Sequence, residues 1–160
     1  MRNLLTLCSL VLFVLGALPN GAGARTADPQ DPVLVGRIAH IEGNLLRYIE
    51  EDKDWVRTVR DAPFGLEDSL YVEEDSRAEF IMPNGTWIRA GEDSQLQLIA
   101  LHPDATTVDV GSGLTRLYNK NPDSIVKVTT PFGAVVATGD TVFDVYVGDE
   151  SVEVIAIRGT

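Results

Sequence analysis

The chain has 160 residues, with 24 acidic and 13 basic side chains and a formal net charge of −11. This acidic balance excludes nucleic acid and anionic membrane surfaces as partners, because no basic patch supplies phosphate contacts. A single cysteine excludes a fold held by disulfide bonds, and the length indicates one domain with a core large enough to hold itself together.

Residues 1–24 have the three parts of a secretory signal peptide. Residues 1–3 are short and basic, residues 4–18 are an almost unbroken apolar run, and residues 22–24 are small. The apolar run is shorter than the roughly 20 residues of a membrane-spanning helix, so cleavage after Ala24 is favoured over an uncleaved anchor. Cleavage would remove Cys8, leave no membrane span, and place the protein in the periplasm or outside the cell.

Residues 25–32 are polar and contain two prolines, which predicts a flexible linker. Residues 33–160 then form the predicted β domain, because short apolar runs alternate with turn residues and no helical period lasts for ten residues. Besides a central hairpin, the predicted strands are residues 33–41, 45–49, 55–59, 70–72, 95–101, 106–110, 114–118, 125–130, 134–137, 142–147 and 152–157.

This pattern predicts an all-β domain of many short, mostly antiparallel strands, arranged as a sandwich, barrel or roll, with a signal helix before it. A β-solenoid is the second choice, because no period of fixed length emerges. Residues 62–65 are interpreted as a break between strands, and residues 111–113, Gly-Ser-Gly, as a turn.

The central hairpin, residues 76–90, allows the strand register to be predicted. Pro83 and Asn84 suit the centre of a type I turn, and Gly85 suits the left-handed residue that follows. Phe80 then lies opposite Ile88, and Ala78 opposite Ala90, on one apolar face. On the other face Ile81 lies opposite Trp87 and Glu79 opposite Arg89.

Residues able to carry out chemistry are few. His40 and His102 belong to no group with metal-ligand spacing, and the acidic residues of 50–54 and 73–75 suit solvated loops. We therefore predict no catalytic, cofactor or metal site. Asn84-Gly85-Thr86 fits an N-glycosylation acceptor, although the turn already accounts for these residues.

Two tryptophans are candidate interaction residues. Trp55 follows the acidic loop, and Trp87 lies beside Arg89 on the less apolar face of the hairpin. An exposed tryptophan is a common anchor for a protein or a sugar, but packing in a core or against a second sheet is favoured, because aromatic side chains bury a large area.

The hairpin resembles the central motif of the FecR domain family, in which an Arg-Ala-Glu strand leads through a glycine turn to an Ile-Arg strand. The matching residues are Arg77, Ala78, Glu79, Gly85, Ile88 and Arg89. A second stretch resembles the Thr-Pro-x-Gly turn and the Gly-x-x-Phe-x-Val strand of the same family. The matching residues are Thr130, Pro131, Gly133, Gly139, Phe143 and Val145.

The resemblance implies an all-β periplasmic module without catalytic activity or cofactor. Typical members follow an anti-sigma segment and a membrane helix, and relay a signal from an outer-membrane receptor. Here a signal peptide takes that place, so we expect a stand-alone exported module that acts in protein interaction, scaffolding or signal relay with an envelope protein partner. The alternative is a cell-wall or carbohydrate-binding module that uses exposed tryptophans to bind glycan or peptidoglycan.

Residues 155–160 end where the family adds another strand. Either the β domain is incomplete at its C-terminal end, which we favour, or an unpaired edge accepts a strand from a partner.

Overall fold

The computed structural model describes residues 33–159; the predicted signal peptide, its helix and the linker of residues 25–32 lie outside this range. Within it the chain forms thirteen strands and no helix, which confirms the predicted all-β fold. None of the described segments is a helix long and apolar enough to span a bilayer. The strands are β1 (Gly36–Glu42), β2 (Leu45–Ile49), β3 (Asp54–Arg57), β4 (Pro63–Phe64), β5 (Ser69–Val72), β6 (Arg77–Ile81), β7 (Thr86–Ala90), β8 (Gln95–His102), β9 (Ala105–Asn119), β10 (Ile125–Thr130), β11 (Gly133–Thr138), β12 (Thr141–Val147) and β13 (Val152–Arg158).

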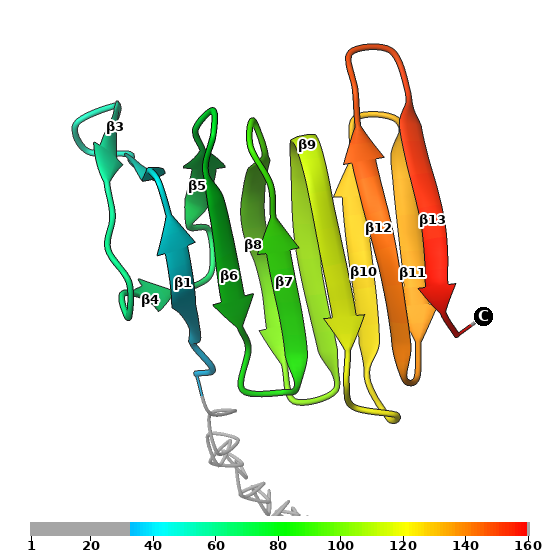
Figure 1. The fold of residues 1–160 in the computed structure, drawn as a ribbon. Helices are drawn as coiled ribbons and strands as arrows, with labels where there is room; N and C mark the ends of the chain where they lie inside the picture. The colour runs from blue at the N-terminus through cyan, green and yellow to red at the C-terminus, as the bar shows by residue number, and fades with distance from the viewer. Residues whose placement is uncertain (1–32, 160) are drawn as a thin grey trace, which may run out of the picture. The chain divides into compact units, whose positions relative to one another are not determined.

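The strands form one hydrogen-bonded network that is folded into two layers (Figure 1). The front layer has the order β4-β1-β6-β7-β9-β12-β13, and the back layer has the order β3-β2-β5-β8-β9-β10-β11. Among the described pairs only β9 and β10 run parallel, so the predicted antiparallel arrangement is confirmed. Two packed layers are the sandwich form of the predicted fold.

Strand β9 joins the two layers, because its first half pairs with β8 and β10 and its second half with β7 and β12. The predicted turn at residues 111–113 is therefore wrong: these residues lie inside a continuous strand of 15 residues. Gly113 has a positive φ of 80°, and a Cβ there would lie 2.4 Å from the Ser94 side-chain oxygen. The glycine allows β9 to pass this close to Ser94 as it changes layer.

The hairpin of β6 and β7 has the predicted register. Phe80 pairs with Ile88, Ile81 with Trp87, and Glu79 with Arg89. Gly85 has a φ of 93° and donates its N–H to the Met82 carbonyl at 3.2 Å, which closes the turn around Pro83 and Asn84. Local turn chemistry and the period-two pattern agree here, so a one-residue slip would expose the core face.

The core lies between the layers and takes alternate side chains from each strand. Phe80 packs against Phe64, with ring centroids 5.0 Å apart. The predicted break at residues 62–65 is partly wrong, because Pro63 and Phe64 form the short strand β4 and Phe64 is completely buried. Burial of this ring stabilises the end of the sandwich near β1.

The two ends of the sandwich differ. Near β4, Arg47 points between the layers, donates to the Pro63 carbonyl and lies 3.6 Å from Asp68. At the other end β11 and β13 each pair with one strand only among the described residues, and Val136, Ile155 and Ile157 are exposed there. This second end is therefore apolar and open to solvent.

Candidate functional site

Side chains that point away from the core of the front layer form rows across four strands. Directly opposite residues on neighbouring strands lie on the same face of a sheet. The apolar and aromatic row contains Ile81, Trp87, Tyr118 and Val142. The next row is charged and contains Glu79, Arg89, Arg116 and Asp144. We call these two rows, with Arg77 and Leu114 beside them, the front face.

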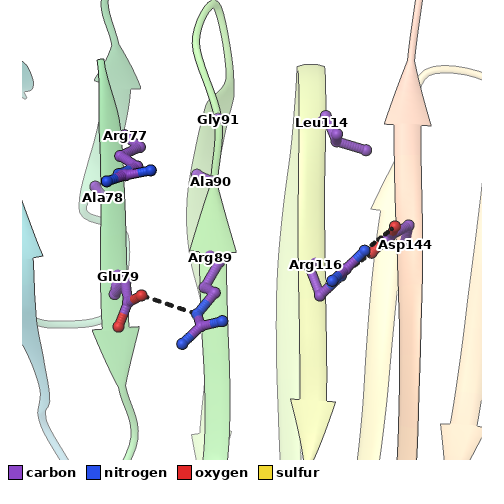
Figure 2. A pocket seen from close by; sticks show the side chains of 9 residues that line it. All are labelled: Arg77, Ala78, Glu79, Arg89, Ala90, Gly91, Leu114, Arg116 and Asp144. Carbon is purple, nitrogen blue, oxygen red and sulfur yellow. Dashed lines mark hydrogen bonds and ion pairs between the residues drawn. The ribbon is translucent and has the colours of Figure 1, made fainter. Parts of the chain in front are cut away.

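Two ion pairs form the charged row (Figure 2). Arg89 Nε lies 2.8 Å from Glu79 Oε1. Arg116 makes a bidentate pair, donating from Nε to Asp144 Oδ1 at 2.6 Å and from Nη2 to Asp144 Oδ2 at 2.8 Å. Since both carboxylates lie on the outer strands of the row, the two arginines are direct neighbours in its middle.

Asp144 is nearly buried, whereas the Arg116 side chain is 44% exposed. The hydrogen bonds to Asp144, and after them the Tyr118 hydroxyl, raise the pKa of Arg116 above its ordinary value. A buried carboxylate without its arginine would be strongly destabilising, so this pair anchors the centre of the front face.

Aromatic rings hold the neighbouring cations in place. Arg89 Nη1 donates to the Tyr118 hydroxyl at 3.0 Å, and the guanidinium carbon lies 5.2 Å from the centroid of the same ring. Lys120 Nζ lies 3.0 Å from the centroid of the Trp87 ring. These cation–π contacts fix the orientation of both rings and cover one face of the Trp87 ring.

A shallow hollow of about 210 Å³ opens on the front face (Figure 2). Small residues lie at its base, and larger side chains form its walls. Its lining residues are Arg77, Ala78, Glu79, Arg89, Ala90, Gly91, Leu114, Arg116 and Asp144. The hollow thus contains both members of the two ion pairs, so charges of both signs lie beside its apolar walls.

The structure places the predicted interaction residues on two different surfaces. Trp87 and Arg89 both lie on β7 in the front face. Trp55 lies on β3, at the edge of the back layer, with ring centroids 5.3 Å from Tyr48 and 6.1 Å from Tyr71. The two tryptophans therefore do not form one site.

Sequence reasoning missed five residues of the front face: Leu114, Arg116, Tyr118, Val142 and Asp144. The alternation of Arg116 and Tyr118 with buried Thr115 and Leu117 is a readable signal that they point outward. The residues that pair with Arg116 and Tyr118 on β7 and β12 could not be predicted in this way, because local sequence does not determine the order of strands in a sheet.

The other residues considered as candidates for chemistry do not come together in one site. His40 and His102 are exposed on β1 and β8, and no group of histidine, cysteine or acidic residues in the described part of the chain is arranged to hold a metal ion. Asn84, which fits a glycosylation acceptor, is buried, and its Nδ2 donates to the His102 carbonyl at 2.8 Å. Its role in the fold is therefore that of a packed turn residue.

A model of the FecR protein family matches residues 68–160, more than half of the chain. The chain belongs to the FecR protein family. The resemblance of the hairpin and of the C-terminal motif to FecR domains is thus confirmed. No curated protein and no solved structure matches the chain.

The first FecR motif falls on both faces of the β6–β7 hairpin. Ala78 and Ile88 are buried in the core, whereas Glu79 and Arg89 form the ion pair of the front face. Arg77 pairs with Glu42 on β1. The FecR hairpin therefore combines a core contribution with a charged outer surface.

The second FecR motif shapes the open end. Thr130 Oγ1 accepts from the Phe132 N–H at 3.2 Å and donates to the Gly133 carbonyl at 3.0 Å, around Pro131. Gly139 lies between β11 and β12, and Phe143 on β12 is buried. These residues bring β11 and β12 into different layers.

Proposed function

We propose that this protein is a non-catalytic regulatory module of the bacterial cell envelope that binds another protein through the front face. FecR domains form a regulatory rather than an enzymatic family associated with the envelope. The predicted signal peptide supports export, either to the periplasm or to the outside of the cell.

The observation that carries this proposal is the composition of the front face. Tryptophan, tyrosine and arginine are the residues most enriched at the energetic centres of protein interfaces. Here Trp87, Tyr118, Arg89 and Arg116 lie side by side on one sheet face, and contacts with Lys120 and Asp144 hold them in place. Such a prearranged surface loses little side-chain entropy when a partner binds.

Site-specific photo-crosslinking in the native host tests the proposal. A photoreactive residue at Leu114, which is exposed beside the hollow, should give a discrete adduct with an envelope protein. The matched control is Ile99 on β8, which has similar exposure but lies in the back layer. Equal adducts from both positions, or no adduct from Leu114, would contradict the proposal.

Glycan binding is the second candidate, favoured by the aromatic cluster of Trp55, Tyr48 and Tyr71. The rings are tilted by 58° and 62° rather than coplanar, so they form no flat platform for a sugar, and protein binding is preferred. Sedimentation with purified peptidoglycan separates the two candidates. Pelleting that Trp55→Ala abolishes and Trp87→Ala preserves would favour the glycan site.

A further inference from the structure

We propose that the hollow of the front face holds one apolar side chain of the partner protein, a leucine or a residue of similar size and shape. This inference rests on the proposed function and adds the chemistry of the partner. Its starting point is Gly91, which lines the hollow at a position where its neighbours carry large side chains.

Gly91 leaves a gap in a row of outward side chains. Its N–H donates to the Leu114 carbonyl at 2.9 Å, so the pairing of β7 with β9 continues for one residue beyond Ala90. Because side chains alternate along a strand, Gly91 lies on the same face as Arg89. Figure 2 shows Gly91 between Arg77 on β6 and Leu114 on β9. The hollow is therefore the space that a side chain at Gly91 would fill.

Neither the backbone nor the packing requires a glycine at this position. Gly91 does not have the positive φ that Gly113 has. A Cβ at Gly91 would lie 3.6 Å from the Leu114 carbonyl oxygen, an ordinary contact. Apart from its chain neighbours, it would meet no other residue of the described part of the chain within 4 Å. The fold would therefore accept a side chain here, and the glycine keeps the hollow open.

The charges around the hollow are already neutralised within the protein. Each of its three arginines is paired with a carboxylate; the pairs are Arg77–Glu42, Arg89–Glu79 and Arg116–Asp144. A charged ligand group would have no unpaired counter-charge to meet, so charge complementarity favours a neutral occupant. A rim of polar groups around an apolar anchor is the usual arrangement of a protein interface.

The walls and the size of the hollow suit one aliphatic side chain. Leu114 is 46% exposed and forms one wall, and the aliphatic stems of Arg89 and Arg116 extend the apolar lining. The volume of about 210 Å³ is smaller than the roughly 300 to 1,000 Å³ of pockets that hold a whole small molecule. Burial of the exposed Leu114 surface against the incoming side chain would drive binding.

Chemical-shift mapping by NMR tests the inference. The probe is the capped tripeptide acetyl-Ser-Leu-Ser-amide, and the controls replace its leucine with asparagine, which has nearly the same shape, or with aspartate or lysine. We expect saturable shifts at the Gly91 amide and the Leu114 methyl groups with the leucine peptide, and a response at least five-fold weaker with each control. Equal responses to the leucine and asparagine peptides, a stronger response to a charged peptide, or shifts of the same size at the Ile99 methyl groups would overturn the inference.

Variants locate the binding site. Gly91→Val places methyl groups in the hollow and should weaken binding of the leucine peptide at least five-fold without lowering the temperature of thermal unfolding. Gly111→Val is the matched control, because Gly111 on β9 also has no positive φ and a Cβ there would make only contacts of 3.8 Å or more. It should leave binding unchanged. Leu114→Asn removes an apolar wall at an exposed position and should also weaken binding at least five-fold. Binding that neither Gly91→Val nor Leu114→Asn weakens would exclude the hollow as the site.

The two proposals fail differently. If the leucine peptide does not bind but Leu114 still gives its specific adduct, the front face binds a partner without this apolar anchor. If the peptide binds and Leu114 gives no adduct, the apolar site exists and the proposed regulatory function is wrong.

Discussion

Asn84 connects the hairpin turn of the front layer to the back layer through its side chain. Its Nδ2 donates to the His102 carbonyl at 2.8 Å and to Thr106 Oγ1 at 2.8 Å, while its Oδ1 accepts from the Thr86 N–H at 3.2 Å. The whole residue is buried, so loss of these bonds would leave polar groups without partners. A buried polar group without a partner destabilises a fold by about 1 to 3 kcal/mol.

We therefore expect Asn84→Ala to lower the free energy of unfolding by about 2 to 3 kcal/mol. Urea denaturation followed by tryptophan fluorescence measures this change. Asn121→Ala is the control, because within residues 33–159 the Asn121 side chain accepts a single hydrogen bond, from the Asp123 N–H. Its loss should have an effect of about 1 kcal/mol or less. Equal effects of the two variants would contradict the bridging role of Asn84.

Tyr71 gives a pH-dependent prediction. Its hydroxyl donates to Asp93 at 2.9 Å, and this hydrogen bond, followed by burial and by the Asp93 charge, raises the pKa of Tyr71 above its usual 10.0. Since the folded pKa lies above the unfolded one, the contribution to stability is complete below about pH 10 and is lost as the pH rises through the folded pKa.

Absorbance of phenolate at 295 nm tests this assignment. The difference between the titrations of the parent and of Tyr71→Phe should show Tyr71 ionising above pH 10. When the same comparison, with and without Tyr71→Phe, is made in the Asp93→Asn variant, the ionisation of Tyr71 should move down toward pH 10, because the anionic acceptor is gone. A Tyr71 curve that stays in place in Asp93→Asn would assign the shift to another cause.

At the scale of single elements, the hairpin and strand β9 differ in how far local sequence determines them. The Pro-Asn-Gly turn and the period-two pattern of β6 and β7 agree, so the register is predictable, and with it the face shared by Trp87 and Arg89. The favoured expectation that the tryptophans pack in a core or against a second sheet is wrong for Trp87, which lies outside the core cluster with Lys120 over its ring. The Gly-Ser-Gly of β9 resembles a turn locally, but pairing with four strands keeps it extended. Tertiary pairing overrides local preference there.

The same limit applies to the front face. Arg89 and Glu79 pair within one hairpin and could be predicted together from the sequence. Arg116 and Asp144 are 28 residues apart in the sequence, and both their ion pair and the position of Arg116 opposite Arg89 depend on strand order. The spacing of residues in the sequence does not determine strand order, so the Arg116–Asp144 half of the charged row could not be predicted.

The glycines of β9 provide a matched pair of variants. Gly113 has a φ of 80°, and a Cβ there would lie 2.4 to 2.7 Å from atoms of Ser94. Gly113→Ala should therefore destabilise the fold by about 2 to 3 kcal/mol through backbone strain and displacement of Ser94. At Gly111 the nearest contacts would be an ordinary 3.8 Å, so Gly111→Ala should be neutral or slightly stabilising. Thermal denaturation compares both, and a loss of stability only in Gly111→Ala would refute this account of β9.

At the scale of the whole molecule, opposing features act on its association. The open end exposes apolar residues on two edge strands, including Ile157 and Val136, and such edges template pairing with other chains. The formal net charge of −11 opposes association by mutual repulsion. Because salt screens the repulsion but not the apolar contact, their balance depends on ionic strength.

We expect the mean mass measured by light scattering to rise with protein concentration, and to rise further between 0.05 and 0.5 M salt, where the Debye length falls from roughly 14 to 4 Å. Ile157→Lys places a charge on the edge and should suppress this increase, as charged edge residues do in natural sheets. Ile99→Lys is matched in exposure, 46% against 49%, but lies on the interior strand β8 and should not suppress it. Equal suppression by both variants would attribute association to general hydrophobicity rather than to the open end, and a mass that does not change with concentration or salt would mean that this end does not associate.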